Sequence, residues 1–99
     1  MNFIKSLLYY ICKNQINMDK LLINNEYYLF SDKEYDKIFN DILNATSYNL
    51  KDNLEDMVGY FADNIVFILN DMFVPVDEDN DCSEIINGFR NYLNYLISL

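Results

Sequence analysis

Four carboxylates occupy the five positions from Asp77 to Asp81, and Glu84 follows them closely with no basic residue nearby in the sequence. A cluster of this kind can bind a cation or can face a basic protein surface. Mutual repulsion among like charges lowers the stability of a fold, and these residues offer no obvious gain in return. We therefore expect a binding site here, with the residues Asp77, Glu78, Asp79, Asp81 and Glu84 facing a partner.

The spacing Asp77-x-Asp79-x-Asp81 matches the opening of a calcium loop of the EF-hand type. That loop also needs a glycine at its sixth position and a bidentate glutamate at its twelfth. Cys82 and Gly88 stand at those two positions. The sequence therefore predicts neither a calcium site nor any other metal or cofactor.

The chain lacks the side chain that most often performs acid–base catalysis, because it contains no histidine. Histidine is the commonest general base, and it also activates serine and cysteine nucleophiles. The two cysteines, Cys12 and Cys82, are too few for a disulfide framework or a zinc site. A carboxylate pair needs a pocket that separates its two pKa values, and no motif marks one. We expect a protein that is not an enzyme.

The charge of the chain points to a basic protein as its partner. The formal net charge is −9, with three lysines against two acids in residues 1–30 and four basic against fourteen acidic residues thereafter. Such a surface repels nucleic acid and anionic lipid. The apolar stretch at residues 6–12 is short for a signal peptide, and no run of 18 apolar residues predicts a membrane span. We expect a cytoplasmic protein that binds neither nucleic acid nor membrane directly.

The segments that position the acidic run are predicted to be helices. Hydrophobic residues make up 52% of the chain, whereas glycine occurs twice and proline once, which favours long helices over a turn-rich sheet. The prediction is an all-α protein: one domain over residues 1–99, built as a bundle of four to five antiparallel helices.

Apolar spacing predicts a first helix over residues 2–14 and a short second helix after Asn17, with Leu21 and Leu22 pointing inward. Residues 21–30 could instead form a small hairpin, because Asn24 and Asn25 tolerate the left-handed conformation of its turn. Helix followed by loop is preferred, since a lone hairpin is only marginally stable.

Three further helices are expected. Ser31-x-x-Glu34 is a capping-box pattern that opens a helix ending near residue 44. Asn49 caps a long central helix, which Pro75 stops. Its predicted buried face is Leu54, Val58, Phe61, Ile65 and Leu69, widened by Val66 and Phe67.

The last helix begins at Asp81 or Ser83 and carries Tyr92 and Tyr95. Tyrosine supplies rigid, amphipathic contact area at interfaces, so we expect these two side chains to be partly exposed and to contact the partner. Gly88 lies inside this helix, where close approach of another backbone would explain it, as would chance. The long helix also has an acidic face, formed by Asp52, Glu55, Asp56 and Asp63, as a second candidate interface.

Two pieces of the chain resemble colicin D-type immunity proteins. They are residues 3–8 (FIKSLL) with 13–21 (KNQINMDKL), and residues 68–77 (ILNDMFVPVD) with the acidic turn and closing helix after them. The run from Pro75 to Glu84 is also similar to the proline, aspartates and following helix of DNase-colicin immunity proteins. The resemblance implies a small acidic inhibitor that shields its producer from a nuclease toxin, including toxins of contact-dependent growth inhibition.

The functional expectation is therefore an immunity protein, or antitoxin, whose acids occlude the cleft of a basic nuclease toxin domain. A viral or phage helical effector that binds a host protein, as a nucleic-acid mimic or a Bcl-2-like decoy, is the alternative. A third possibility is a homo-oligomeric module that uses an edge formed by Tyr92, Leu96 and Leu99.

Overall fold

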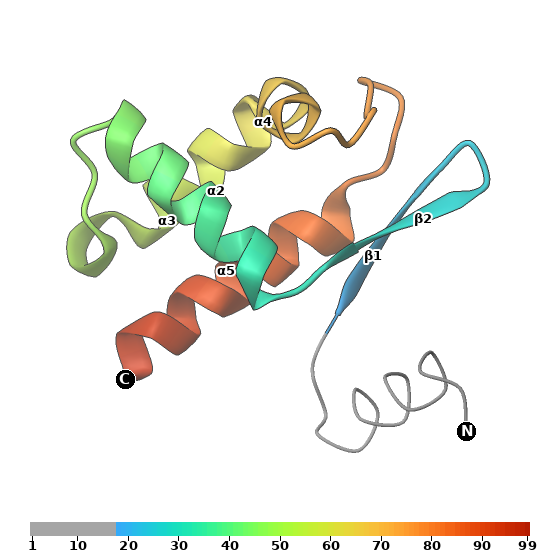
Figure 1. The fold of residues 1–99 in the computed structure, drawn as a ribbon. Helices are drawn as coiled ribbons and strands as arrows, with labels where there is room; N and C mark the ends of the chain where they lie inside the picture. Colours follow the sequence, from blue (N-terminus) through green and yellow to red (C-terminus); the bar gives the residue numbers. More distant parts are fainter. Residues whose placement is uncertain (1–17) are drawn as a thin grey trace, which may run out of the picture.

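The computed structural model describes residues 18–99, so the helix expected at residues 2–14 lies outside the described part (Figure 1). The described chain forms a two-stranded antiparallel sheet followed by four helices. None of these helices is both long and apolar enough to cross a membrane. In chain order the elements are β1 (Asp19–Ile23), β2 (Glu26–Phe30), α2 (Asp32–Ala45), α3 (Leu50–Asp63), α4 (Ile65–Asp71) and α5 (Ser83–Ser98).

The prediction of a purely all-α bundle is wrong in one element, because residues 19–30 form a β-hairpin and not a helix followed by a loop. Asn24 and Asn25 have φ angles of 51° and 67°, which fit the two-residue turn that matches the twist of paired strands. Side chains alternate along β1: Leu21 and Ile23 are buried, whereas Leu22 is exposed. The hairpin is not isolated, since β1 packs against α5, and this contact supplies the stability that a lone hairpin lacks.

The predicted starts of α2 and α3 are confirmed, whereas the N-cap of α5 is Cys82 and not Asp81 or Ser83. At the start of α2 the carboxylate of Glu34 accepts hydrogen bonds from the backbone N–H and the hydroxyl of Ser31, both at 2.7 Å. At the start of α3 the side chain of Asn49 accepts a hydrogen bond from the Asp52 N–H at 2.9 Å. These contacts satisfy donors that have no partner inside a helix.

The long central helix is interrupted at Asn64, which separates α3 from α4. The Asn64 side-chain amide donates to the Tyr60 carbonyl at 2.9 Å, and the Asn64 backbone N–H donates to the same oxygen at 3.1 Å. An asparagine side chain that competes for backbone groups in this way disfavours a straight helix. Val58, Phe61 and Leu69 are buried as expected, whereas Leu54 and Ile65 are only partly buried.

Helix α5 is the element around which the described core is built, because it packs against α3, α2 and β1 (Figure 1). Phe61 of α3 meets Phe89 of α5 edge-to-face, with ring centroids 5.0 Å apart. This geometry is favourable for two aromatic rings. The largest fully buried side chains come from all six described elements and are Phe30, Phe61, Phe89, Leu21, Ile38, Ile42, Met57, Leu69, Ile85 and Leu93.

Gly88 marks the point where β1, α2 and α5 come closest together. The Tyr35 hydroxyl donates a hydrogen bond of 2.5 Å to Oδ2 of Asp19, and this pair lies directly over the Gly88 α-carbon. A β-carbon at position 88 would overlap both the Asp19 carboxylate and the Tyr35 hydroxyl. The close approach expected at this glycine is therefore made by two side chains.

The two glycines form a matched pair for testing this packing. Gly88→Ala should lower the free energy of unfolding by about 1–3 kcal/mol, because the new methyl group overpacks the contact. Gly59→Ala should instead raise it by up to about 1 kcal/mol, because open space surrounds that helical position. Urea unfolding followed by circular dichroism measures both, and a harmless Gly88→Ala would contradict the described packing.

Candidate functional site

Residues 77–81, called here the acidic turn, form an exposed but internally bonded connection between α4 and α5. The Asp77 N–H donates to the Asn80 side chain at 2.8 Å, and the Asp79 N–H donates to Oδ1 of Asp77 at 2.9 Å. Oδ1 of Asp81 accepts from the backbone N–H and the hydroxyl of Ser83, at 3.0 and 2.5 Å. The hydrogen bonds from Ser83 lower the pKa of the Asp81 carboxyl, so its charge persists well below neutral pH.

Both ends of the acidic turn are anchored in the core. Val76 precedes it and Cys82 follows it, and both side chains are buried. The Asn70 side-chain amide also donates to the Val76 carbonyl at 3.0 Å. The turn is thus held as a defined shape and does not behave as a loose loop.

Glu84, predicted to face a partner, instead bonds within the protein. Its Oε2 accepts a hydrogen bond of 2.6 Å from the backbone N–H of Lys20 in β1. This bond ties the first turn of α5 to the outer edge of the hairpin. Glu84 therefore links two elements of the fold, whereas the four carboxylates of the acidic turn do not.

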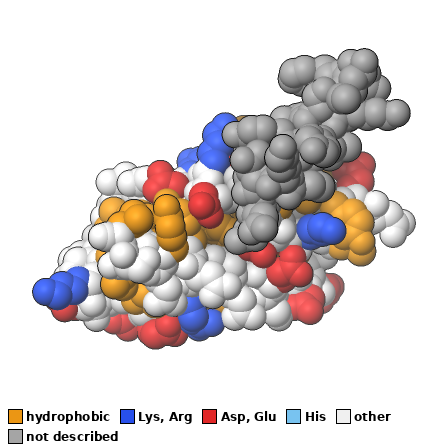
Figure 2. Space-filling model, turned by 90° about the horizontal axis from the view of Figure 1, so that it is seen from below, with side chains coloured by type: hydrophobic (Ala, Val, Ile, Leu, Met, Phe, Trp, Pro, Cys, Tyr) orange, Lys and Arg blue, Asp and Glu red, His pale blue; other side chains and the backbone are white. Residues whose placement is uncertain are grey.

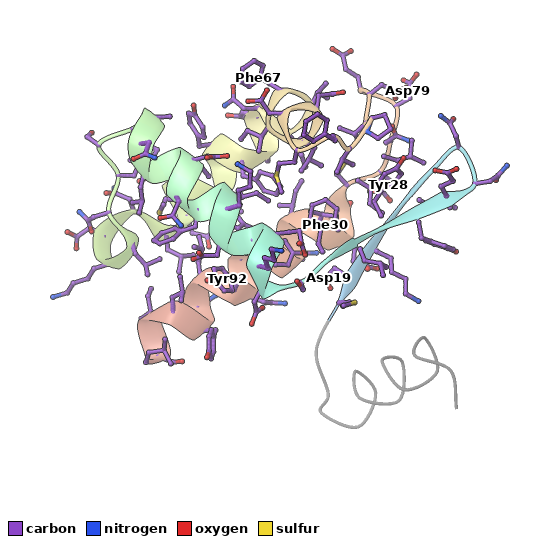
Figure 3. All side chains as sticks on the ribbon, viewed as in Figure 1. Asp19, Tyr28, Phe30, Phe67, Asp79 and Tyr92 are labelled. Atoms are coloured by element: carbon purple, nitrogen blue, oxygen red, sulfur yellow. The ribbon has the colours of Figure 1, made fainter. Side chains whose placement is uncertain are left out.

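The two predicted tyrosines do not lie with the acidic turn. Tyr92 is only 8% exposed, so the expectation of partial exposure is wrong for this residue, and its hydroxyl donates to Oδ1 of Asp36 at 2.9 Å. Burial, with help from that hydrogen bond, raises the pKa of Tyr92 to about 12. Tyr95 is 53% exposed, but it stands twelve residues beyond the start of α5, about 18 Å along the helix axis. In Figure 3, Tyr92 lies between α2 and α5 in the lower half of the view, well away from Asp79 at the upper right.

Two exposed phenylalanines lie near the acidic turn, and sequence reasoning missed both. Phe67 of α4 is 72% exposed, although the sequence pattern assigned it to the core, and Phe73 is 92% exposed. Phe67 and Glu78 line the same shallow hollow of about 630 Å³. Phe67 and Asp79 accordingly lie on one edge of the molecule (Figure 3). The buried positions Phe61, Ile68 and Leu69 keep helical spacing across Asn64, with Ile65 partly buried between them. Phe67 lies off this stripe, so the error came from widening the predicted buried face beyond it.

Phe73 occupies a position where glycine is the usual residue. The Val74 N–H bonds to the Leu69 carbonyl, and the Phe73 N–H bonds to the Asn70 carbonyl, which together form a Schellman motif at the end of α4. The motif requires a positive φ at Phe73, and the observed φ is 64°. A bulky residue with this conformation is strained, and an exposed ring gains nothing from burial.

The second candidate acidic face, on α3, is partly neutralised. Arg90 of α5 bonds to Glu55 through three contacts of 3.0–3.3 Å, and Asp56 accepts from the Asn53 side chain. Figure 2, which views the molecule from below, likewise shows acidic side chains interspersed with apolar and basic ones. The acidic turn, in contrast, has no basic partner among the salt bridges of residues 18–99.

Residues 18–99 do not bring three or more potential metal ligands together. Comparisons with protein-family models, with curated proteins and with solved structures found no match to this chain. The described residues thus place an acidic turn next to the exposed ring of Phe67.

Replacing Phe73 tests whether its side chain contributes to the stability of the fold. Phe73→Asn should raise the free energy of unfolding by up to about 1 kcal/mol, because asparagine adopts a left-handed conformation more easily. Phe67→Ala, at a helical position with ordinary geometry, is the control and should change stability little. A Phe73→Asn variant that loses more than 1 kcal/mol in urea unfolding would show that the ring stabilises the fold.

Proposed function

We propose that this protein is an immunity protein that binds and inhibits a basic nuclease toxin domain. The observation that carries the proposal is the acidic turn, which exposes four carboxylates on a backbone held by hydrogen bonds and by buried anchors at both ends. Two of these carboxylates, those of Asp77 and Asp81, also accept hydrogen bonds within the turn region. The resemblance of residues 68–77 to colicin D-type immunity proteins points in the same direction.

Rigidity supports binding through this turn. A mobile acidic loop would lose conformational entropy when it meets a partner, and that loss would offset much of the attraction. In the acidic turn the folding of the chain has already ordered the backbone. The turn can therefore present its charges to a basic cleft with little further ordering.

Inhibition would need no chemistry from this protein. A nuclease cleft is basic because it holds a polyanion, and carboxylates placed over it compete with nucleic-acid phosphates. Phe67 and Phe73 add exposed apolar area next to the charges, where aromatic residues commonly carry much of the binding energy. Charge then governs how fast the two proteins associate, and the aromatic rings govern how slowly they separate.

The test compares two variants that each remove two negative charges. Asp77→Asn with Asp79→Asn leaves an oxygen that can still accept the Asp79 N–H bond, so the turn should keep its shape. Asp52→Asn with Asp56→Asn makes the same charge change on α3. The association rate with a candidate basic nuclease domain, sought first among neighbouring genes, should fall by about tenfold or more for the first variant only, with a weaker dependence on salt.

Binding is measured by surface plasmon resonance across a salt series, with circular dichroism and urea unfolding as folding controls. Equal losses in both variants would indicate a general charge effect without a defined site. Loss only in the α3 variant would move the interface to the opposite acidic face. A failure of the unaltered protein to bind or inhibit that nuclease would reject the immunity function and favour an effector with a different protein target.

A further inference from the structure

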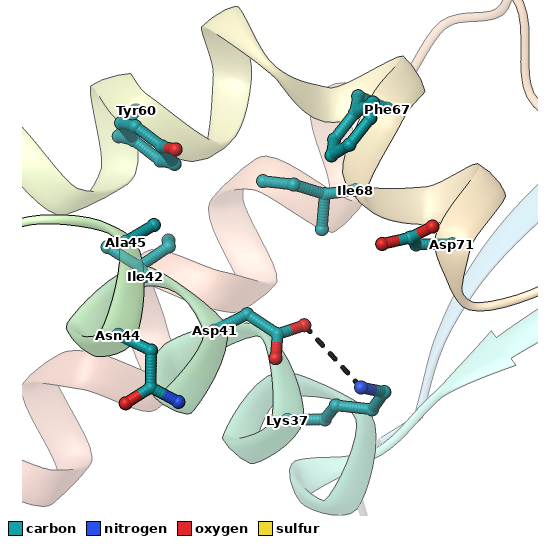
Figure 4. Close-up of a pocket in the computed structure, with 9 residues that line it drawn as sticks. All are labelled: Lys37, Asp41, Ile42, Asn44, Ala45, Tyr60, Phe67, Ile68 and Asp71. Carbon is teal, nitrogen blue, oxygen red and sulfur yellow. Dashed lines mark hydrogen bonds and ion pairs between the residues drawn. The ribbon is translucent and has the colours of Figure 1, made fainter.

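A groove opens between α2 and α4, and Phe67 forms part of its wall (Figure 4). It has a volume of about 350 Å³, near the lower end of the roughly 300–1,000 Å³ typical of ligand sites. Ile42 and Ile68, both buried, form its floor, and Phe67 and Tyr60 stand along one side. A space of this size accepts a side chain and is too small for a helix.

Two carboxylates face each other across this groove, Asp41 from α2 and Asp71 from α4 (Figure 4). Lys37 approaches Asp41, with Nζ 3.5 Å from Oδ2, and both side chains are about half exposed. Within residues 18–99, Asp71 takes part in no salt bridge. The groove is therefore lined by one basic side chain and two acidic ones, so one negative charge is not neutralised.

We infer that this groove receives an arginine side chain of a basic partner protein. The guanidinium is planar and carries five N–H donors, so it can bond to a carboxylate on one edge while its face lies against an aromatic ring. Asp71 and Asp41 supply the carboxylates, and Phe67 supplies the exposed ring. The apolar floor suits the methylene stem of the same side chain.

Arginine fits these groups better than the other basic side chain. A lysine ammonium is a compact and strongly hydrated charge, and it makes no flat contact with a ring. Lys37 already supplies an ammonium group at Asp41. The remaining features, an aromatic face and a second carboxylate, are those that a planar cation uses.

The groove is continuous with the surface proposed above for the toxin. Phe67 lines both the groove and the hollow that contains Glu78 of the acidic turn. A partner that covers Phe67 would thus meet the acidic turn on one side and the groove on the other. The identity of the partner as a basic protein rests on the proposed function, but the chemistry of the groove can be measured without that partner.

The probe is N-acetyl-arginine amide, titrated into ¹⁵N-labelled full-length protein and followed by NMR chemical shifts. Saturable shifts should concentrate on the groove segments, residues 37–45 and 67–71. N-acetyl-citrulline amide has nearly the same shape without the charge, and it should cause almost none. N-acetyl-lysine amide should bind several-fold more weakly than the arginine compound.

Variants assign the binding to the groove. Asp41→Asn with Asp71→Asn should weaken arginine binding at least about fivefold, whereas Asp52→Asn with Asp56→Asn should leave it unchanged. Shifts of equal size at all acidic positions, or an equal effect of citrulline, would overturn the inference. If no arginine site is found but the acidic-turn variant still loses toxin binding, the groove proposal is rejected and the toxin proposal stands. If the arginine site is found but the protein binds no toxin, the toxin proposal is rejected and the groove proposal stands.

Discussion

One hydrogen bond, from the Tyr35 hydroxyl to the Asp19 carboxylate, holds the three parts of the described fold together. It joins β1 to α2, and its position over Gly88 requires α5 to lie directly beneath both. Burial, reinforced by the Asp19 bond, raises the pKa of the Tyr35 hydroxyl, so the proton of this bond remains in place throughout the physiological pH range. The contact is partly buried, where a hydroxyl or carboxylate without a partner would be costly.

The position of the acidic turn depends on that contact. Once α5 is seated under the hairpin, Glu84 bonds to the backbone of Lys20, and the first turn of α5 is fixed. Cys82 and Val76 then enter the core at the two ends of the acidic turn. The carboxylates between them cannot move toward the interior, so their repulsion is relieved only by solvent, by salt ions or by a basic partner.

Local signals in the sequence were enough to predict α2, the start of α3, and α5, because capping residues and apolar spacing act over a few neighbouring positions. The hairpin could be named only as an alternative, since its stability comes from α5, which is distant in the sequence. The interruption at Asn64 depends on which hydrogen bond one side chain makes, which apolar spacing does not reveal. Tyr92 was wrongly expected to be partly exposed for a similar reason, because Asp36 on another helix accepts a hydrogen bond from its hydroxyl. Phe67 was wrongly assigned to the core because hydrophobicity was given more weight than its place off the buried stripe.

The position of α5 in the chain also determines when the core can form during synthesis. Helix α5 contacts β1, α2 and α3, and it is synthesised after all of them. A nascent chain in which α5 has not yet been translated therefore carries apolar faces that lack a major partner, and such chains are prone to aggregate. Completion of the described core must wait until α5 has left the ribosome.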